Sequence, residues 1–297
     1  MPETDTLNSI AATDLAAASA GAPRAHRVHP GFRLTLGLTI TWLSLIVVLP
    51  IAAALVKVAG LSWEDVWRIA SSERALAAYK LSFGLSLGAA LINLVFGTLT
   101  AWVMVRYRFP GRRILDAMID LPFALPTAVA GIALATLYAP SGWLGAPLAA
   151  LGLDVAFKPV GILVALVFVG LPFVVRTVQP ALQDLDPALE EAAATLGASR
   201  AQVVRWVVIR QLLPAALTGF TLSFSRAIGE YGSVIFIAGN IPMVSEIAPL
   251  LIVVHLEQYD YAGATVLAVA MLVISFVMLL LINLAQRWSG HRPGGAH

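Results

Sequence analysis

The chain has 297 residues, of which 59% are hydrophobic and 12% are charged, and its mean hydropathy is +0.85. This charged fraction is about half of that in a typical soluble domain, so the composition argues against a soluble globular protein. The chain contains no cysteine, which excludes disulfides and thiolate metal sites, and its net charge of +2 excludes a broadly basic surface for nucleic acid.

Six apolar stretches are each long enough to cross a bilayer, for which a helix needs about 20 mostly apolar residues. They predict an all-α polytopic membrane protein with about six transmembrane helices. The expected helices cover roughly residues 34–58, 82–105, 114–138, 160–181, 214–237 and 262–285.

The distribution of basic residues predicts the orientation of these helices. If the N-terminus lies inside, 13 of the 19 Lys and Arg residues fall on the cytoplasmic side, five fall on the other side, and Arg226 lies within a helix. Basic residues accumulate in cytoplasmic loops of membrane proteins. We therefore expect both termini to be cytoplasmic.

The third expected helix contains two prolines, Pro122 and Pro126, and Thr127 follows the second. Each proline removes a backbone donor and clashes with the preceding turn. Backbone groups freed in this way within a bilayer must face protein or a water-filled cavity. The pattern therefore indicates either a broken helix that lines a pathway or a packing kink, and the sequence leaves both open.

The segment between the fourth and fifth expected helices carries strong helix-boundary signals. Asp186 can cap a helix that starts at Pro187, and Gly197 can end that helix in a left-handed conformation. Ser199 with Gln202 forms a capping-box pattern that would open a second helix before Pro214 begins the fifth span. This element would either dock into another protein or lie on the lipid surface.

The same segment resembles a known family. Glu191, Ala192 and Ala193, followed after three residues by Gly197, resemble the Glu-Ala-Ala…Gly loop of permease subunits in bacterial binding-protein-dependent ABC importers. The family pattern continues with Ile-x-Leu-Pro, whereas residues 207–210 here read Val-Val-Ile-Arg. The resemblance implies a coupling loop over about 183–213 that docks into a groove of an ATPase subunit, with the residues Glu190, Glu191, Ala192, Ala193, Gly197 and Arg200.

Three longer stretches, residues 121–134, 168–180 and 226–242, resemble the T-type permease subunits of sulfate/thiosulfate ABC importers. The likeness covers roughly residues 35–288. It implies the type I permease fold of ABC importers, a location in the bacterial inner membrane, and import of sulfate, and of thiosulfate, by alternating access. A permease for molybdate, tungstate or another oxyanion is the alternative.

The resemblance also implies partners: a second homologous permease subunit, two copies of an ABC ATPase, and a periplasmic sulfate-binding protein. The chain has no Gly-x-x-x-x-Gly-Lys-Ser/Thr loop, so we expect ATP and Mg²⁺ to be used by the partner ATPase and not by this chain. We expect no catalytic residue, no metal, no bound cofactor and no nucleic-acid partner.

The expected organisation has four parts. Residues 1–33 form a disordered cytoplasmic tail, 34–78 a first transmembrane helix with a periplasmic segment, 79–286 the permease domain, and 287–297 a cytoplasmic tail.

Arg226 and Glu230 lie four residues apart, hence on one helical face if the fifth helix includes both. Charged side chains inside membranes are costly and usually pair or face a bundle interior. Arg226 would therefore either contact sulfate or pair with Glu230 to hold a helix register. We favour the pair, because a neighbouring carboxylate repels a dianion. Hydroxyl donors for an anion, or polar contacts between helices, are Thr127, Ser223, Ser225 and Ser233.

Two other classes fit the sequence less well. An ion-coupled secondary transporter would show inverted repeats with buried carboxylates in both halves, and only Glu230 is expected deep in a helix. An intramembrane enzyme would need a nucleophile and a base. His255 is the one histidine outside the termini, and it is expected with Glu257 and Asp260 in an exposed outer loop.

Overall fold

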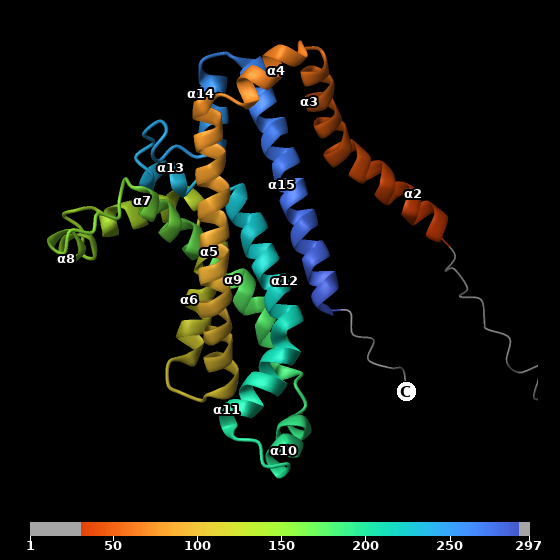
Figure 1. Ribbon diagram of the computed structural model, residues 1–297, viewed down its shortest axis with the longest axis vertical. Coiled ribbons are helices and arrows are strands. Elements are labelled where there is room, and N and C mark those ends of the chain that lie inside the picture. The colour runs from red at the N-terminus through yellow and green to blue at the C-terminus, as the bar shows by residue number, and fades with distance from the viewer. Residues whose placement is uncertain (1–30, 291–297) are drawn as a thin grey trace, which may run out of the picture. The chain divides into compact units, whose positions relative to one another are not determined.

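A computed structural model describes residues 31–290, and all regular secondary structure in this range is helical (Figure 1). Residues 1–30 and 291–297 of the two expected tails lie outside the described residues, whereas residues 287–290, expected in the C-terminal tail, belong to the last helix. The chain divides into two compact units, Met1–Ala53 and Ala54–His297. The first unit contains α2 (Phe32–Leu43), the π-helical segment η1 (Ser44–Val48) and the beginning of α3 (Leu49–Ala59).

The second unit holds most of the helices. They are α4 (Trp63–Ala70), α5 (Glu73–Arg106), α6 (Arg112–Ala124), α7 (Thr127–Tyr138), α8 (Gly145–Ala150), α9 (Pro159–Gln183), α10 (Pro187–Thr195), α11 (Arg200–Gln202), the π-helical segment η2 (Val203–Val208), α12 (Ile209–Ile228), α13 (Val234–Ile237), α14 (Ala248–Glu257) and α15 (Tyr261–Gly290).

Within the described residues, five helices are long and apolar enough to cross a membrane: Leu34–Ala59, Glu73–Arg106, Pro159–Gln183, Arg200–Ile228 and Tyr261–Gln286. The pair α6 and α7 makes a sixth if it counts as one bent span. The prediction of an all-α protein with about six transmembrane helices is confirmed.

The core of the second unit is formed by α5, α9 and α12, which pack against one another (Figure 1). In their centre, Asn93 Nδ2 donates a hydrogen bond of 3.1 Å to Ser223 Oγ. Gly170 lies against this pair so closely that a Cβ there would be 2.4 Å from Ser223 Oγ. At one end of the core α6 packs on α9, and at the other end α14 packs on α5 and α15 (Figure 1).

The third expected helix is broken, with an angle of 115° between α6 and α7. Pro122 lies inside α6 and does not interrupt it, so its expected role as a break is wrong. The break is at Leu125, whose backbone is extended (φ −85°, ψ 136°) directly before Pro126. This follows from the steric clash that keeps a residue preceding proline out of the helical region.

The fifth expected helix, 214–237, has different boundaries from those predicted. One continuous helical span runs from Arg200 to Ile228 with Pro214 inside it, and residues Val234–Ile237 form the separate helix α13. Proline has a backbone angle suited to a helix and lacks only one donor, so a membrane helix can continue through it. As a result, Glu230 follows the helix instead of lying in it.

Candidate functional site

The connection between α9 and α12 begins with the short helix α10. Asp186 precedes this helix in an extended conformation, and its Oδ1 accepts a 2.9 Å hydrogen bond from the backbone N–H of Ala188. Pro187 occupies the first helical position, where a missing N–H costs nothing. The helix therefore starts where the sequence predicts it.

The end of α10 also agrees with the prediction. Gly197 has φ +85°, and its N–H donates to Ala194 O at 3.0 Å, while the N–H of Ala198 donates to Ala193 O at 3.1 Å. These two bonds form the Schellman arrangement that favours glycine. The next helix opens with the expected capping box, in which Ser199 N donates to Gln202 Oε1 at 2.8 Å.

The surface of α10 is largely uncovered by the rest of the chain. Glu191 and Ala192 are exposed, Ala193 is half-buried, and Leu196 is 88% exposed at the end of the helix. Glu190 forms an ion pair with Arg106 at the end of α5, which ties α10 to the helical core. Arg200 is exposed at the start of α11. A small-residue helix with an exposed leucine can enter a groove on another protein.

A second group of predicted residues surrounds the carboxylate of Glu230, which is 2% exposed. Arg226 Nη1 lies 2.5 Å from Glu230 Oε2. Oε1 accepts hydrogen bonds from the backbone N–H of Ser233 at 2.9 Å and from its hydroxyl at 3.0 Å. Both carboxylate oxygens thus have partners, and the arrangement fits a charge pair that fixes the chain after α12.

The break before α7 lies beside the same segment. A Cβ on Gly232 would be 2.1 Å from Thr127 Oγ1, so α7 begins in direct contact with the chain between Glu230 and Ser233. The structure therefore brings Thr127 against the backbone segment that connects Glu230 with Ser233.

Two other predicted residues do not join this group. Ser223 is buried against Asn93 in the core, and Ser225 Oγ donates to the carbonyl oxygen of Thr221 at 2.7 Å on its own helix. Ser223 thus makes the contact between helices that the structural interpretation predicts, whereas the bond of the Ser225 hydroxyl lies within its own helix.

Two sets of ion pairs that involve the long helices were missed from the sequence. Arg176 on α9 pairs with Asp116 and Asp120 on α6, and Arg74 on α5 pairs with Glu246. Arg176 lies in α9, within the expected helix 160–181. The available signal was the presence of charged residues inside apolar stretches, where they need partners.

A further pair lies where α14 meets α15. His255 Nδ1 lies 2.8 Å from Asp260 Oδ2, and the N–H of Gly263 donates to Asp260 Oδ1 at 2.9 Å. Two hydrogen bonds hold the pKa of Asp260 below its ordinary value: the larger effect comes from the Gly263 N–H and the smaller one from His255. His255 belongs to α14, so this pair joins α14 to α15 and is not part of an exposed loop as expected. No group of three or more metal-ligating side chains occurs among residues 31–290.

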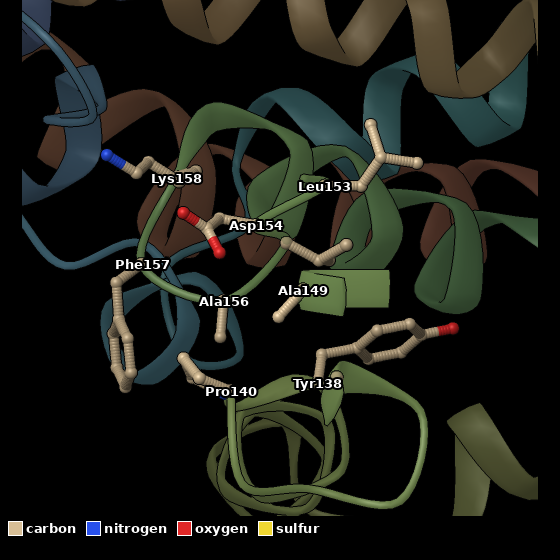
Figure 2. Close-up of a pocket in the computed structure, with 10 residues that line it drawn as sticks. Tyr138, Pro140, Ala149, Leu153, Asp154, Ala156, Phe157 and Lys158 are labelled. Atoms are coloured by element: carbon tan, nitrogen blue, oxygen red, sulfur yellow. The ribbon is translucent and has the colours of Figure 1, made fainter. Parts of the chain in front are cut away.

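A hollow of about 210 Å³ lies beside α8. Figure 2 shows Asp154 and Ala156 on the loop that lies across from Tyr138 and Pro140. The volume is below the roughly 300–1,000 Å³ of typical ligand pockets. None of the residues predicted for coupling or for the pathway lines this hollow, which we therefore do not assign to the transported solute.

The chain is similar to known proteins over most of its length. Two relatives are named sulfate transport system permease protein CysT. The relative from Synechocystis sp. is 53% identical over 84% of this chain and 87% of its own length. The relative from Salmonella typhimurium is 46% identical over 91% of this chain and 97% of its own length.

Solved structures show the same fold. A crystal structure of a bacterial ABC transporter involved in the import of the acidic polysaccharide alginate contains a chain with a TM-score of 0.71, at 18% identity. The match covers 86% of this chain and 96% of that one. The family described as the binding-protein-dependent transport system inner membrane component matches residues 93–293. The chain is a member of this family of inner-membrane transport components.

Proposed function

We propose that this chain is a permease subunit of an ATP-driven ABC importer that carries sulfate, with thiosulfate as a second cargo. The observation that carries this proposal is its 46–53% identity to sulfate permease proteins over 84–91% of its length. Identity at this level extends through the helices that would form the pathway, and not only through the loop shared by all such permeases.

The coupling element in this proposal is α10. Its exposed small-residue surface and Leu196 enter a groove of the ATPase, of which two copies bind the importer and use ATP and Mg²⁺. A second homologous permease subunit completes the pathway, and a periplasmic sulfate-binding protein delivers the anion. Both termini lie on the cytoplasmic side, with α10.

The path of motion follows from the connectivity. The capping box at Ser199 joins α10 to the continuous helix Arg200–Ile228, so a displacement of α10 is transmitted along this helix. At its far end lies the Glu230 segment, in contact with the start of α7 at the broken span. Closure of the ATPase pair would thus open and close the pathway near this break by alternating access.

Sulfate recognition within this chain would rely on neutral donors. The positive charge of Arg226 is matched by the negative charge of Glu230, so the pair has no net charge with which to attract a dianion. Thr127 beside the break can donate its hydroxyl, and backbone N–H groups at a break serve the same purpose. We therefore place most of the selectivity in the sulfate-binding protein.

Radiolabelled sulfate uptake tests the proposal. Cells lacking this gene should lose sulfate uptake and keep molybdate uptake, and restoring the gene should restore sulfate uptake. Competition with unlabelled thiosulfate tests the second cargo. In a strain without another sulfate importer, sulfate uptake that survives deletion would overturn the assignment, and a selective loss of molybdate uptake would identify the other oxyanion as the cargo.

A further inference from the structure

The short helix α10 is connected to the three core helices in two different ways. The chain itself joins α10 to α9 before it and, through α11 and η2, to α12 after it. None of its residues is buried, and it packs chiefly on η2. Within residues 31–290, the ion pair of Glu190 with Arg106 is the only hydrogen bond or ion pair between α10 and another helix. This pair therefore links α10 to α5, the core helix to which it has no direct chain connection.

The two charges of this pair lie where the ends of their helices favour them. Arg106 occupies the last turn of α5, where the free carbonyl groups attract a cation. Glu190 occupies the first turn of α10, where the free N–H groups attract an anion. The guanidinium carbon of Arg106 also lies 5.3 Å from the centre of the Trp102 ring, and Trp102 packs against the apolar cluster shared by α5, α9 and α12. The guanidinium is thus held between the core and α10.

The exposure of the pair shows that it contributes little to the stability of the fold. The side chains of Arg106 and Glu190 are 30% and 26% exposed, and ion pairs that water reaches add little to the free energy of unfolding. The adjacent charges do not substitute for it: Glu191 and Arg108 are exposed, and neither forms an ion pair within the described residues. The pair is therefore better suited to transmitting a displacement than to holding the fold together.

The helix that receives this displacement reaches the opposite end of the unit. With 34 residues, α5 is about 50 Å long. At its beginning, the guanidinium of Arg74 donates two hydrogen bonds of 2.7 Å to the carboxylate of Glu246, in the segment before α14. In Figure 1, α5 runs from the end that holds α4 and α14 toward the end that holds α10 and α11. One helix thus joins α10 to the Glu246 segment, with an ion pair at each end.

We propose that Arg106 is a positioning residue for coupling: its pair with Glu190 transmits the displacement of α10 to α5, which carries it to the Glu246 segment. The inference rests on the proposed function, from which it takes the ATPase-driven displacement of α10. It adds a second route to the one along Arg200–Ile228. With the pair intact, α10 moves α5 and α12 together. Without it, α5 follows only through its packing on α9 and α12.

The amount of sulfate imported per ATP hydrolysed tests this link, measured in proteoliposomes with the complete importer and its sulfate-binding protein. Arg106→Gln should lower this ratio at least about threefold, which lies within the range by which single side chains alter coupling between distant sites. Arg108→Gln is the matched control, because it removes the same charge from an exposed side chain two residues further along, and it should leave the ratio unchanged. The amount of ATPase that copurifies with Arg106→Gln should equal that of the unaltered importer, because the pair contributes little to stability.

A double variant tests whether Arg106 acts through Glu190. Glu190→Gln should also lower the ratio, and the variant with both changes should be no worse than the worse single variant, because each change removes the same interaction. Additive losses in the double variant would overturn the link. So would an unchanged ratio in Arg106→Gln, equal losses in Arg106→Gln and Arg108→Gln, or reduced assembly with a normal ratio per assembled complex.

The unaltered importer separates this inference from the proposed function. If it imports sulfate, and Arg106→Gln imports as much sulfate per ATP, the link alone fails. If it hydrolyses ATP and imports molybdate but not sulfate, the sulfate assignment fails, and the same ratio measured with molybdate decides whether the link stands.

Discussion

The α10 connection and the tertiary ion pairs of the second unit are specified in different ways. In α10, residues within a few positions of one another define both ends: Asp186 caps Ala188, and Gly197 bonds back to Ala194. The ion pairs instead join distant residues, since Arg74 and Glu246 are 172 positions apart and Arg176 and Asp120 are 56 apart.

This difference has an energetic counterpart. The bonds around α10 are exposed and exchange readily with water, so each contributes little to stability. In the Arg74–Glu246 and Arg226–Glu230 pairs the carboxylate is 2% exposed, and a buried charge without its partner is strongly destabilising. We therefore expect variants of the ion pairs to affect assembly first, and variants of α10 to affect coupling first.

The largest effect is expected for Arg74→Leu. It leaves the carboxylate of Glu246, which is 2% exposed, without its two hydrogen bonds of 2.7 Å, at a cost of roughly 3 kcal/mol. The thermal unfolding midpoint of the purified complex should fall sharply. The matched control is Arg68→Leu, which removes an exposed pair with Asp65 and should change stability by less than about 1 kcal/mol. Equal losses of stability in both variants would show that burial of the Glu246 carboxylate is not the cause of the destabilisation.

A smaller effect is expected for Arg226→Gln. Glu230 loses its ion pair but keeps both hydrogen bonds from Ser233, so the destabilisation should be about 2 kcal/mol. Assembly of the complex should decrease, while sulfate uptake per assembled complex stays near normal. Normal assembly together with lost uptake would show instead that Arg226 acts on the anion, and it would defeat the structural interpretation.

Gly197→Val should cost about 1 kcal/mol, because only glycine adopts φ +85° without strain. No atom lies within 4 Å of the position of an added Cβ, so the effect arises from the backbone conformation and not from a clash. Binding of the ATPase and sulfate uptake should fall about fivefold while the chain remains in the membrane. Gly229→Ala is the matched control, since Gly229 has an ordinary φ of −88° and open space as well. Wild-type uptake and ATPase binding in Gly197→Val would refute the role of this turn.

These contrasts explain which features could be predicted from the sequence. The boundaries of α10 and the capping box at Ser199 were predicted correctly, because the residues that determine them are neighbours in the chain. The number of spans was also predicted, since length and apolarity are local properties. The start of the fifth span was placed wrongly at Pro214, because helix packing and not the proline decides where this helix continues.

The tertiary ion pairs could not be predicted as pairs. Arg176 was counted with the basic residues of the cytoplasmic side because it lies near the end of the expected helix 160–181, and nothing near it in the sequence points to Asp116 or Asp120. Glu246 lies in the loop before α14, yet its side chain is buried, with Arg74 of α5 as its partner. A charge inside an apolar stretch shows that a partner is needed, but the identity of that partner depends on how the helices pack.

The smallest effect is expected at the His255–Asp260 pair, which lies between the two extremes because its residues are close in sequence but join two helices. The pKa of Asp260 is lowered by the Gly263 N–H and then by His255, so the folded protein favours the carboxylate. This stabilisation is present above the unfolded pKa of about 3.9 and is lost as the pH falls through the lower folded value. Wild-type importer should therefore lose more stability between pH 5 and acid conditions than Asp260→Asn does, as measured by the unfolding midpoint. Because Asp260 is 45% exposed, the difference should be small, and parallel pH profiles of the two proteins would show that the corner between α14 and α15 does not depend on this charge.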